Sequence, residues 1–150
     1  MQYRKLGSSD LNVSVIGLGT NNFGNPQRIP DPADSAKVIY ACLDNGINFI
    51  DTANVYSRGR SETITGEALA RNGKRDSVVL ATKFHGAMAD DDPNMRGGRR
   101  RHPIAVCAAS LTRLKTDYID LYQIHRPRPD TAIDETLRAL DDLIRAGKVR

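Results

Sequence analysis

Short apolar runs alternate with amphipathic segments along most of the chain. The runs are predominantly apolar, which is typical of strands buried on both faces. In the segments between them, apolar residues recur every three or four positions, as on one face of a helix. We therefore predict strands over Val15–Gly19, Ile47–Ile50, Val78–Ala81 and Tyr118–Ile124. Helices are predicted around Val38–Leu43, Ser61–Arg71, Pro103–Lys115 and Ile133–Ile144.

Glycine and proline mark the ends of these elements. Glycine accepts the left-handed conformation that closes a helix, and it follows three of the predicted helices, at Gly46, Gly73 and Gly147. Pro103 suits the first turn of a helix, where its missing N–H costs no hydrogen bond. Ahead of the first strand, Tyr3–Leu6 and Leu11–Val13 flank a turn-forming Gly-Ser-Ser-Asp segment, which predicts an N-terminal β-hairpin.

Four strands that alternate with four helices predict an α/β fold with a parallel sheet. Both a doubly wound sheet and a (β/α)₈ barrel fit this pattern. No domain boundary is visible, so residues 1–150 are expected to form one domain. The last helix carries Ile133, Leu137, Leu140 and Ile144 on one face, and Val149-Arg150 is typical of the approach to a fifth strand.

Composition places the chain among ordinary globular proteins. Hydrophobic residues make up 39% and charged residues 27% of its 150 positions, and the formal net charge is +4. No apolar stretch approaches the roughly 18 residues of a membrane span, so no membrane association is expected. The first twenty residues contain no apolar signal region, which favours a cytoplasmic location.

The cysteines and histidines and one basic run are further candidates for binding sites. Cys42 and Cys107 have no metal-like or redox spacing, which favours two free thiols in a reducing compartment and no metal site. Neither His85 nor His102 has the partners that a metal ion would need. The basic run Arg99–His102 contains no aromatic residues for base stacking, so we interpret it as a solvated loop rather than a nucleic-acid site.

Ionisable residues follow three successive predicted strands. Asp51 ends the second strand, Lys83 the third and His125 the fourth. The carboxyl ends of parallel strands form one rim, which is where α/β enzymes place their active sites. Tyr56 lies five residues after Asp51, in the loop that leaves the same rim. We therefore expect these four side chains to converge.

Such a set suits the reduction of a carbonyl group. A phenol ordinarily titrates near 10, and a neighbouring ammonium favours the phenolate. Lys83 would thus make Tyr56 a better proton donor, while Asp51 would hold the Lys83 amine in place. His125 would donate a hydrogen bond to a substrate oxygen as charge develops there. The absence of an evident nucleophile or metal-ligand set favours hydride delivery to carbon with a proton to oxygen.

Several segments of the sequence, spread over nearly its whole length, match one known family. They are Tyr3-Arg4-Lys5-Leu6-Gly7, Gly17-Leu18-Gly19-Thr20, Asn48-Phe49-Ile50-Asp51-Thr52-Ala53, Tyr56-Ser57-Arg58-Gly59-Arg60-Ser61-Glu62, Val79-Leu80-Ala81-Thr82-Lys83, Ser110-Leu111-Thr112-Arg113-Leu114 and Asp117-Tyr118-Ile119-Asp120-Leu121-Tyr122-Gln123-Ile124-His125. In these segments the sequence resembles the N-terminal half of an aldo-keto reductase. The start and the Tyr56 motif are similar to the bacterial and channel-subunit-like branch of that family.

This resemblance implies a (β/α)₈ barrel, the reduction of aldehydes or ketones and the use of NADPH or, less often, NADH. It implies that Asp51, Tyr56, Lys83 and His125 form a catalytic tetrad with Tyr56 as the general acid. Gly19, Thr20 and Asp51 would lie beside the nicotinamide and its ribose.

Length separates this chain from a complete enzyme of that family. A barrel of this kind takes at least roughly 200 residues, whereas four βα units fill the 150 residues here. We expect the chain alone to be inactive or weakly active and to self-associate through its open edges. The alternative is a non-catalytic half-barrel that binds nucleotide or serves within a larger assembly.

Overall fold

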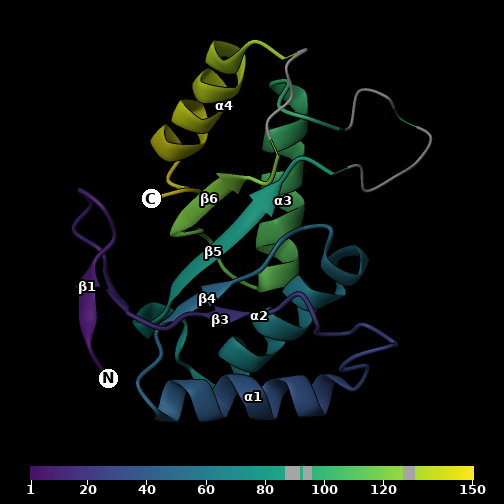
Figure 1. The fold of residues 1–150 in the computed structure, drawn as a ribbon. Coiled ribbons are helices and arrows are strands. Elements are labelled where there is room, and N and C mark those ends of the chain that lie inside the picture. The colour runs from purple at the N-terminus through teal and green to yellow at the C-terminus, as the bar shows by residue number, and fades with distance from the viewer. Residues whose placement is uncertain (87–91, 93–95, 127–130) are drawn as a thin grey trace.

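A computed structural model describes residues 1–86, 92, 96–126 and 131–150. Within these residues an N-terminal hairpin precedes an alternation of strands and helices (Figure 1). The hairpin consists of β1 (Tyr3–Lys5) and β2 (Asn12–Ser14), paired antiparallel with Tyr3 opposite Ser14. The Tyr3 hydroxyl donates to the carbonyl of Gly46 at 2.8 Å, which fixes the hairpin to the end of the first long helix. The predicted hairpin is therefore confirmed.

The described strands after the hairpin form one parallel sheet in chain order: β3 (Leu18–Gly19), β4 (Phe49–Asp51), β5 (Val79–Phe84) and β6 (Leu121–Ile124). The α-helices are α1 (Pro32–Asp44), α2 (Arg60–Asn72), α3 (Arg101–Leu114) and α4 (Ile133–Arg145). Short 3₁₀ turns are η1 (Tyr56–Gly59) and η2 (Arg75–Ser77). Figure 1 shows α1, α2 and α3 side by side along the sheet. Chain order without a reversal is the arrangement of a barrel wall, whereas a doubly wound sheet reverses at a switch point.

Alternation along the strands separates a helix-facing layer from the opposite face of the sheet. Ile50, Leu80 and Phe84 are fully buried in the main hydrophobic core, together with residues of the helices. Asp51 and Lys83 occupy the alternate positions, where side chains are only partly buried. The sheet thus presents its apolar side to the helices and its ionisable side chains to the opposite face.

The closest approach between α2 and α3 depends on Gly66. A Cβ at this position would lie 2.4 Å from the backbone carbon of Leu114 and 2.5 Å from the carbonyl oxygen of Arg113. These neighbours are backbone atoms, so a rotamer change cannot relieve the clash. Gly66 therefore sets the separation of two helices that cover the sheet.

We predict that Gly66→Ala destabilises the fold by about 1–3 kcal/mol or more, because overpacking forces the backbone to shift. At an unconstrained helix position the same change would stabilise the protein by roughly 0.5–1 kcal/mol. The sign of the change in the free energy of unfolding therefore shows whether the helices are packed this closely. Chemical denaturation monitored by circular dichroism measures it. Ala70→Gly, at an exposed position of α2, is the control for helix propensity alone. A Gly66→Ala protein that unfolds at higher denaturant would contradict this packing.

Three predicted strands are shorter than expected and one is longer: β4 begins at Phe49 rather than Ile47, whereas β5 extends from Val79 to Phe84. Val15–Gly19 contributes only Leu18 and Gly19 to the sheet, and Val15 and Ile16 are 39% and 57% exposed. The Val15 N–H instead donates to Gln2 at 3.0 Å, which extends the hairpin. In the fourth strand, the carboxylate of Asp120 accepts the Leu80 N–H at 3.0 Å, so a side chain takes the place of a strand carbonyl.

The chain end runs along the outer edge of the sheet. Ile119 and Val149 form a parallel bridge: the Ile119 N–H donates to Lys148, and the Arg150 N–H donates to Ile119, each at 3.0 Å. The predicted approach to a fifth strand at Val149-Arg150 is thereby confirmed.

Helix α4 exposes much of its apolar face. Ile133, Leu137 and Ile144 are 58%, 54% and 49% exposed, while Thr136, Ala139 and Leu143 are buried against the rest of the fold. Four apolar residues at helical spacing thus form a stripe of which three lie at the surface, and we name Ile133, Leu137, Leu140 and Ile144 the α4 stripe. Among the described helices, none is long and apolar enough to cross a membrane.

The basic run Arg99–His102 lies at the start of α3 rather than in a free loop. Arg100 forms an ion pair with Asp142 of α4, and its backbone N–H donates to Glu135 at 3.0 Å. Arg99 and Arg101 are exposed, and His102 is fully buried. The interpretation as a solvated run therefore holds for the flanking arginines and is wrong for His102.

Candidate active site

The carboxyl ends of β4, β5 and β6 bring the predicted residues together. In the sheet register Gly19 lies beside Asp51, and Lys83 lies beside Gln123. The backbone N–H of His125 donates to Phe84 at 2.9 Å, which continues the β5–β6 ladder by one residue. Parallel pairing in chain order therefore places Asp51, Lys83 and His125 on one rim.

Lys83 is at the centre of the site. Its ammonium donates to the Oδ2 of Asp51 at 2.5 Å, to the backbone carbonyl of Thr52 at 2.8 Å and to the hydroxyl of Tyr56 at 3.3 Å. An ammonium has three protons to donate, and these contacts use all three. The Lys83 and Asp51 side chains are 14% and 30% exposed, so the pair is screened from solvent but still reachable. The expected ion pair and the Lys83–Tyr56 contact are both present in the structure.

The loop after β4 turns sharply to present Tyr56. The Tyr56 N–H donates to Ala53 at 3.1 Å, and the next two residues, Ser57 and Arg58, have φ of 49° and 54°. This left-handed backbone is uncommon outside glycine. The Ser57 hydroxyl donates to the carbonyl of Phe23 at 2.9 Å and so ties the loop to the segment after β3. Tyr56 is therefore held on the rim by backbone geometry as well as by Lys83.

His125 approaches Tyr56 from β6. The two rings meet edge to face, with centroids 5.7 Å apart and planes at 86°. Partial burial, followed by the positive charge of Lys83, lowers the pKa of His125 below its usual range. The imidazole is thus neutral at pH 7 and keeps one N–H that can donate to a substrate oxygen.

The predicted cofactor positions Gly19 and Thr20 differ in their exposure to solvent. Gly19 is exposed, and nothing lies within 4 Å of the place where a Cβ would be, which leaves open backbone beside Asp51. Thr20 is fully buried; its hydroxyl donates to the carbonyl of Asp51 at 3.1 Å and its N–H to the same oxygen at 3.0 Å. An open backbone next to a carboxylate and an ammonium leaves room for a polar ligand. The side chain of Thr20 instead supports Asp51.

Among the described residues, His102 and the two cysteines make none of the contacts that join Asp51, Tyr56, Lys83 and His125. Burial, with a smaller contribution from His85, lowers the pKa of His102 to about 4, so its ring is neutral. Burial raises the pKa of Cys107 to about 11, which leaves the thiol protonated, and Cys42 is also a free thiol. No cluster of three or more His, Cys, Asp or Glu suited to a metal ion occurs within the described residues.

Sequence reasoning did not identify the polar residues behind the site. Ser61 and Glu62 lie in the first turn of α2 and are 0% exposed, and Thr52 and Thr82 are equally buried. All four lie within segments that carry the family resemblance. One sequence signal could have indicated the threonines: Thr52 directly follows Asp51, and Thr82 directly precedes Lys83.

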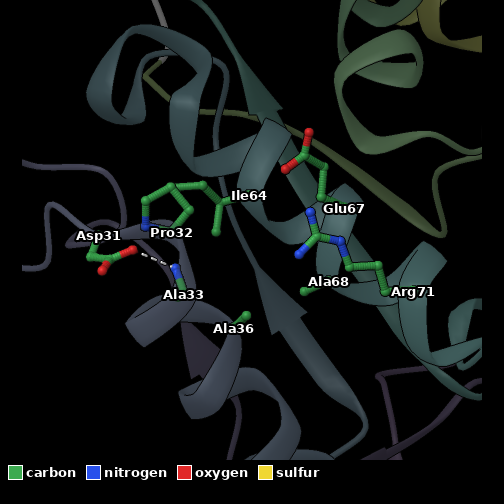
Figure 2. A pocket seen from close by; sticks show the side chains of 8 residues that line it. All are labelled: Asp31, Pro32, Ala33, Ala36, Ile64, Glu67, Ala68 and Arg71. Atoms are coloured by element: carbon green, nitrogen blue, oxygen red, sulfur yellow. Dashed lines mark hydrogen bonds between the residues drawn. The ribbon is translucent and has the colours of Figure 1, made fainter.

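A separate hollow of about 240 Å³ lies between α1 and α2, away from the tetrad. Figure 2 shows Asp31 at the start of α1, with its carboxylate accepting the Ala33 N–H, and Glu67 and Arg71 on α2 across from it. The Asp31 bond is an ordinary helix cap. This hollow gathers no residue of the rim and is a groove in the outer helical layer.

Chemically, the rim offers one phenol, one ammonium, one carboxylate and one neutral imidazole. The phenol can donate a proton and the ammonium beside it can stabilise the resulting phenolate. The imidazole N–H can donate to an oxygen on which charge develops. No group among these four is arranged as a nucleophile with an adjacent base. The arrangement therefore suits proton donation to an oxygen atom that gains negative charge.

Comparison with known proteins finds a matching family model and similar sequences. The model of the "Aldo/keto reductase family" matches residues 15–150. The chain is 42% identical to the aldo-keto reductase YhdN of Bacillus subtilis, over 100% of this chain and 45% of that protein. It is 40% identical to a "Probable voltage-gated potassium channel subunit beta" of Arabidopsis thaliana, over 98% of this chain and 44% of that protein.

A solved structure gives the same relationship in three dimensions. The aldo-keto reductase AKR11C1 from Bacillus halodurans, in its holo form, is 36% identical and superposes with a TM-score of 0.89. The match covers 100% of this chain and 48% of that one. The chain thus spans about half the length of the relatives it matches, and its fold is part of an aldo-keto reductase barrel. Because the family model covers nearly all of it, this chain belongs to the aldo-keto reductase family.

Proposed function

We propose that this protein reduces aldehydes or ketones to alcohols with NADPH, and that NADH is the alternative donor. The observation that carries the proposal is the ammonium of Lys83, which contacts the Asp51 carboxylate and the Tyr56 hydroxyl at the same time. The family relationship supports an oxidoreductase. Because the match covers under half of each relative, activity and cofactor are proposals for the complete gene product.

In the proposed reaction Tyr56 gives its proton to the carbonyl oxygen as that oxygen becomes an alkoxide. Lys83 stabilises the phenolate left behind, and Asp51 keeps the Lys83 ammonium oriented. His125, neutral at pH 7, donates a hydrogen bond to the same oxygen. A bound nicotinamide supplies the hydride. Gly19 and Asp51 would hold its ribose end, and the Thr20 side chain would act only through Asp51.

The test is an assay of NADPH consumption with small aldehydes and ketones, with the alcohol product identified. The complete gene product is expected to form alcohol in step with NADPH loss, and more slowly with NADH. Binding of NADPH without turnover on any carbonyl compound would contradict the reductase proposal.

A second candidate function is nucleotide binding without turnover, as part of a larger assembly. The observation that favours it is the 40% identity to the plant protein named as a probable potassium channel subunit. Both candidates use the same rim, so the product assay separates them. We further propose a reducing compartment such as the cytoplasm, because both Cys42 and Cys107 are free thiols.

We propose that the 150-residue chain by itself is weakly active at most and self-associates with a second copy. The sheet order ends at β3 and β6, each of which pairs with only one strand of the described sheet. The α4 stripe adds an exposed apolar surface. Open strand edges and exposed apolar patches both promote association.

Light scattering coupled to size-exclusion chromatography measures this association. The chain is expected to elute above the 16.5 kDa mass of one copy, and Leu137→Lys is expected to shift it towards that mass. Arg138→Ala, at the neighbouring exposed position of α4, is the matched control and should leave the elution unchanged. A chain that stays monomeric at all concentrations would contradict the proposal.

A further inference from the structure

A buried polar cluster lies directly behind the rim, on the helix side of the sheet. Ser61 and Glu62, in the first turn of α2, are both 0% exposed. A carboxylate is almost never fully buried unless it is paired. The first turn of α2 therefore has a specific set of partners, and two of them, Thr52 and Thr82, are next to Asp51 and Lys83 in the chain.

Ser61 joins the ends of β3 and β4. Its hydroxyl lies 2.8 Å from both the carbonyl and the hydroxyl oxygen of Thr20 and 3.1 Å from the hydroxyl of Thr52. Thr20 in turn donates to the carbonyl of Asp51. One side chain of α2 thus fixes the backbone on both sides of the Asp51 carboxylate.

Glu62 joins β5 to α3. Its Oε1 accepts the Thr82 hydroxyl at 2.5 Å, and its Oε2 accepts the Arg113 Nε–H at 2.6 Å. Arg113 supplies the positive charge that a buried carboxylate requires. The Thr82 side chain is therefore held from behind by a charged acceptor, which makes a stronger hydrogen bond than a neutral one.

The geometry of the strands links the contacts of Ser61 and Glu62 to the side chains on the rim. Successive side chains point to opposite faces of a sheet, so a fixed Thr82 fixes the direction of Lys83. The carbonyl of Thr52 also accepts the Lys83 ammonium at 2.8 Å. Tyr56 begins η1, which leads directly into α2. A single segment, 56–62, therefore supplies the phenol and both of the residues that anchor its partners.

We propose that Ser61 and Glu62 are positioning residues, which hold Asp51, Lys83 and Tyr56 at their contact distances by clamping Thr52 and Thr82. They touch neither substrate nor cofactor. The expected effect on turnover rests on the proposed function. The contacts among Asp51, Lys83 and Tyr56 do not depend on turnover and can be tested without it. If the cluster were only structural, loosening it would lower stability and leave the ionisation behaviour of the rim unchanged.

The experiment compares Thr82→Val with Thr65→Val. Valine keeps the shape of threonine and removes its hydroxyl. Thr65 is also fully buried in α2, but its hydroxyl donates at 2.8 Å to the carbonyl of Ser61 within its own helix. In the complete gene product, Thr82→Val is expected to lower kcat by about 10–100-fold with little change in KM, because small misplacements at a reacting centre have effects of this order. Thr65→Val is expected to leave kcat within a few-fold.

A second readout needs no turnover. The ¹³Cζ resonance of Tyr56, assigned by its loss in Tyr56→Phe, is followed as a function of pH. In Thr82→Val it is expected to titrate at higher pH than in the parent, because a displaced ammonium stabilises the phenolate less. Thr82→Ser restores the hydroxyl and is expected to restore the parent titration. If Thr82→Val does not fold, Ser61→Ala tests the β4 side with the same expectation.

The outcomes separate this inference from the proposed function. Absent turnover with a Tyr56 titration that moves in Thr82→Val would contradict the reductase proposal and support the clamp. Turnover that falls equally in Thr82→Val and Thr65→Val, with an unmoved Tyr56 titration, would overturn the clamp and leave the reductase proposal standing. If the Tyr56 titration in Thr82→Ser does not return to that of the parent protein, the proposed positioning role of Ser61 and Glu62 is also overturned.

Discussion

Tyr56→Phe is expected to lower carbonyl reduction by the complete gene product by about 10²–10⁴-fold, the range that general acid catalysis usually contributes. The substitution removes the donated proton and changes the volume of the side chain very little. The edge-to-face contact with His125 is expected to persist, because it involves the ring and not the hydroxyl. NADPH affinity, measured by fluorescence titration, should therefore stay close to that of the parent protein.

Tyr40→Phe is the matched control for this variant. Tyr40 lies on α1 and is also partly buried, and it packs beside the main core rather than on the rim. It is expected to keep full activity. Turnover of a reactive aldehyde that survives Tyr56→Phe within a few-fold would show that another group donates the proton.

Lys83→Met is the second substitution with a large expected effect. It removes the charge that contacts both Asp51 and Tyr56 while it keeps an unbranched side chain. An ammonium favours the phenolate, so its loss makes the phenol a weaker acid. Turnover is expected to fall by at least about 10²-fold, and the pH profile of the remaining activity is expected to shift towards higher pH.

Lys74→Met, at an exposed position after α2, is the control for the loss of one positive charge. It should leave both the rate and the pH profile unchanged. If Lys83→Met retains the parent pH profile, Lys83 supports the fold around Asp51 and has no part in the ionisation of Tyr56.

The rim was predictable because it follows from a general property of parallel sheets. Asp51, Lys83 and His125 each end an apolar run, and parallel pairing in chain order brings such ends together. The contacts of the Lys83 ammonium with Asp51 and Tyr56 were expected from the same property of the sheet. Its contact with the Thr52 carbonyl and the sharp loop that returns Tyr56 to the rim were not predicted. In that loop Ser57 and Arg58 have left-handed backbone conformations. Such conformations are uncommon outside glycine, and no local sequence pattern predicts them here.

The clamp behind the rim was missed for a different reason. Ser61 and Glu62 are polar residues at a helix start, a position where such residues are usually solvent-exposed caps. Glu62 is buried against Arg113 and Thr82, and Ser61 against Thr20 and Thr52, all of them outside α2. The Glu62–Arg113 ion pair between α2 and α3, with its hydrogen bond to Thr82 of β5, is a tertiary property, and helical periodicity does not report it.

The boundaries of β3 and the exposure of α4 show what a local pattern cannot determine. Val15 and Ile16 are apolar, yet the hairpin takes the backbone of Val15 and the sheet begins at Leu18. The α4 stripe has the spacing of a core-facing helix, yet Leu137 is 54% exposed. Periodicity predicts an apolar face; the presence of a neighbour decides whether that face is buried.

The most direct test of the reductase proposal is isotopic. NADPH that carries deuterium at the transferred position of C4 is incubated with an aldehyde and the complete gene product, and the alcohol is analysed by mass spectrometry. Tyr56 as proton donor and a nicotinamide as hydride donor predict one deuterium on the former carbonyl carbon and a solvent-derived proton on its oxygen. Alcohol formed without deuterium on carbon, or NADPH oxidised with no alcohol formed, would contradict the account.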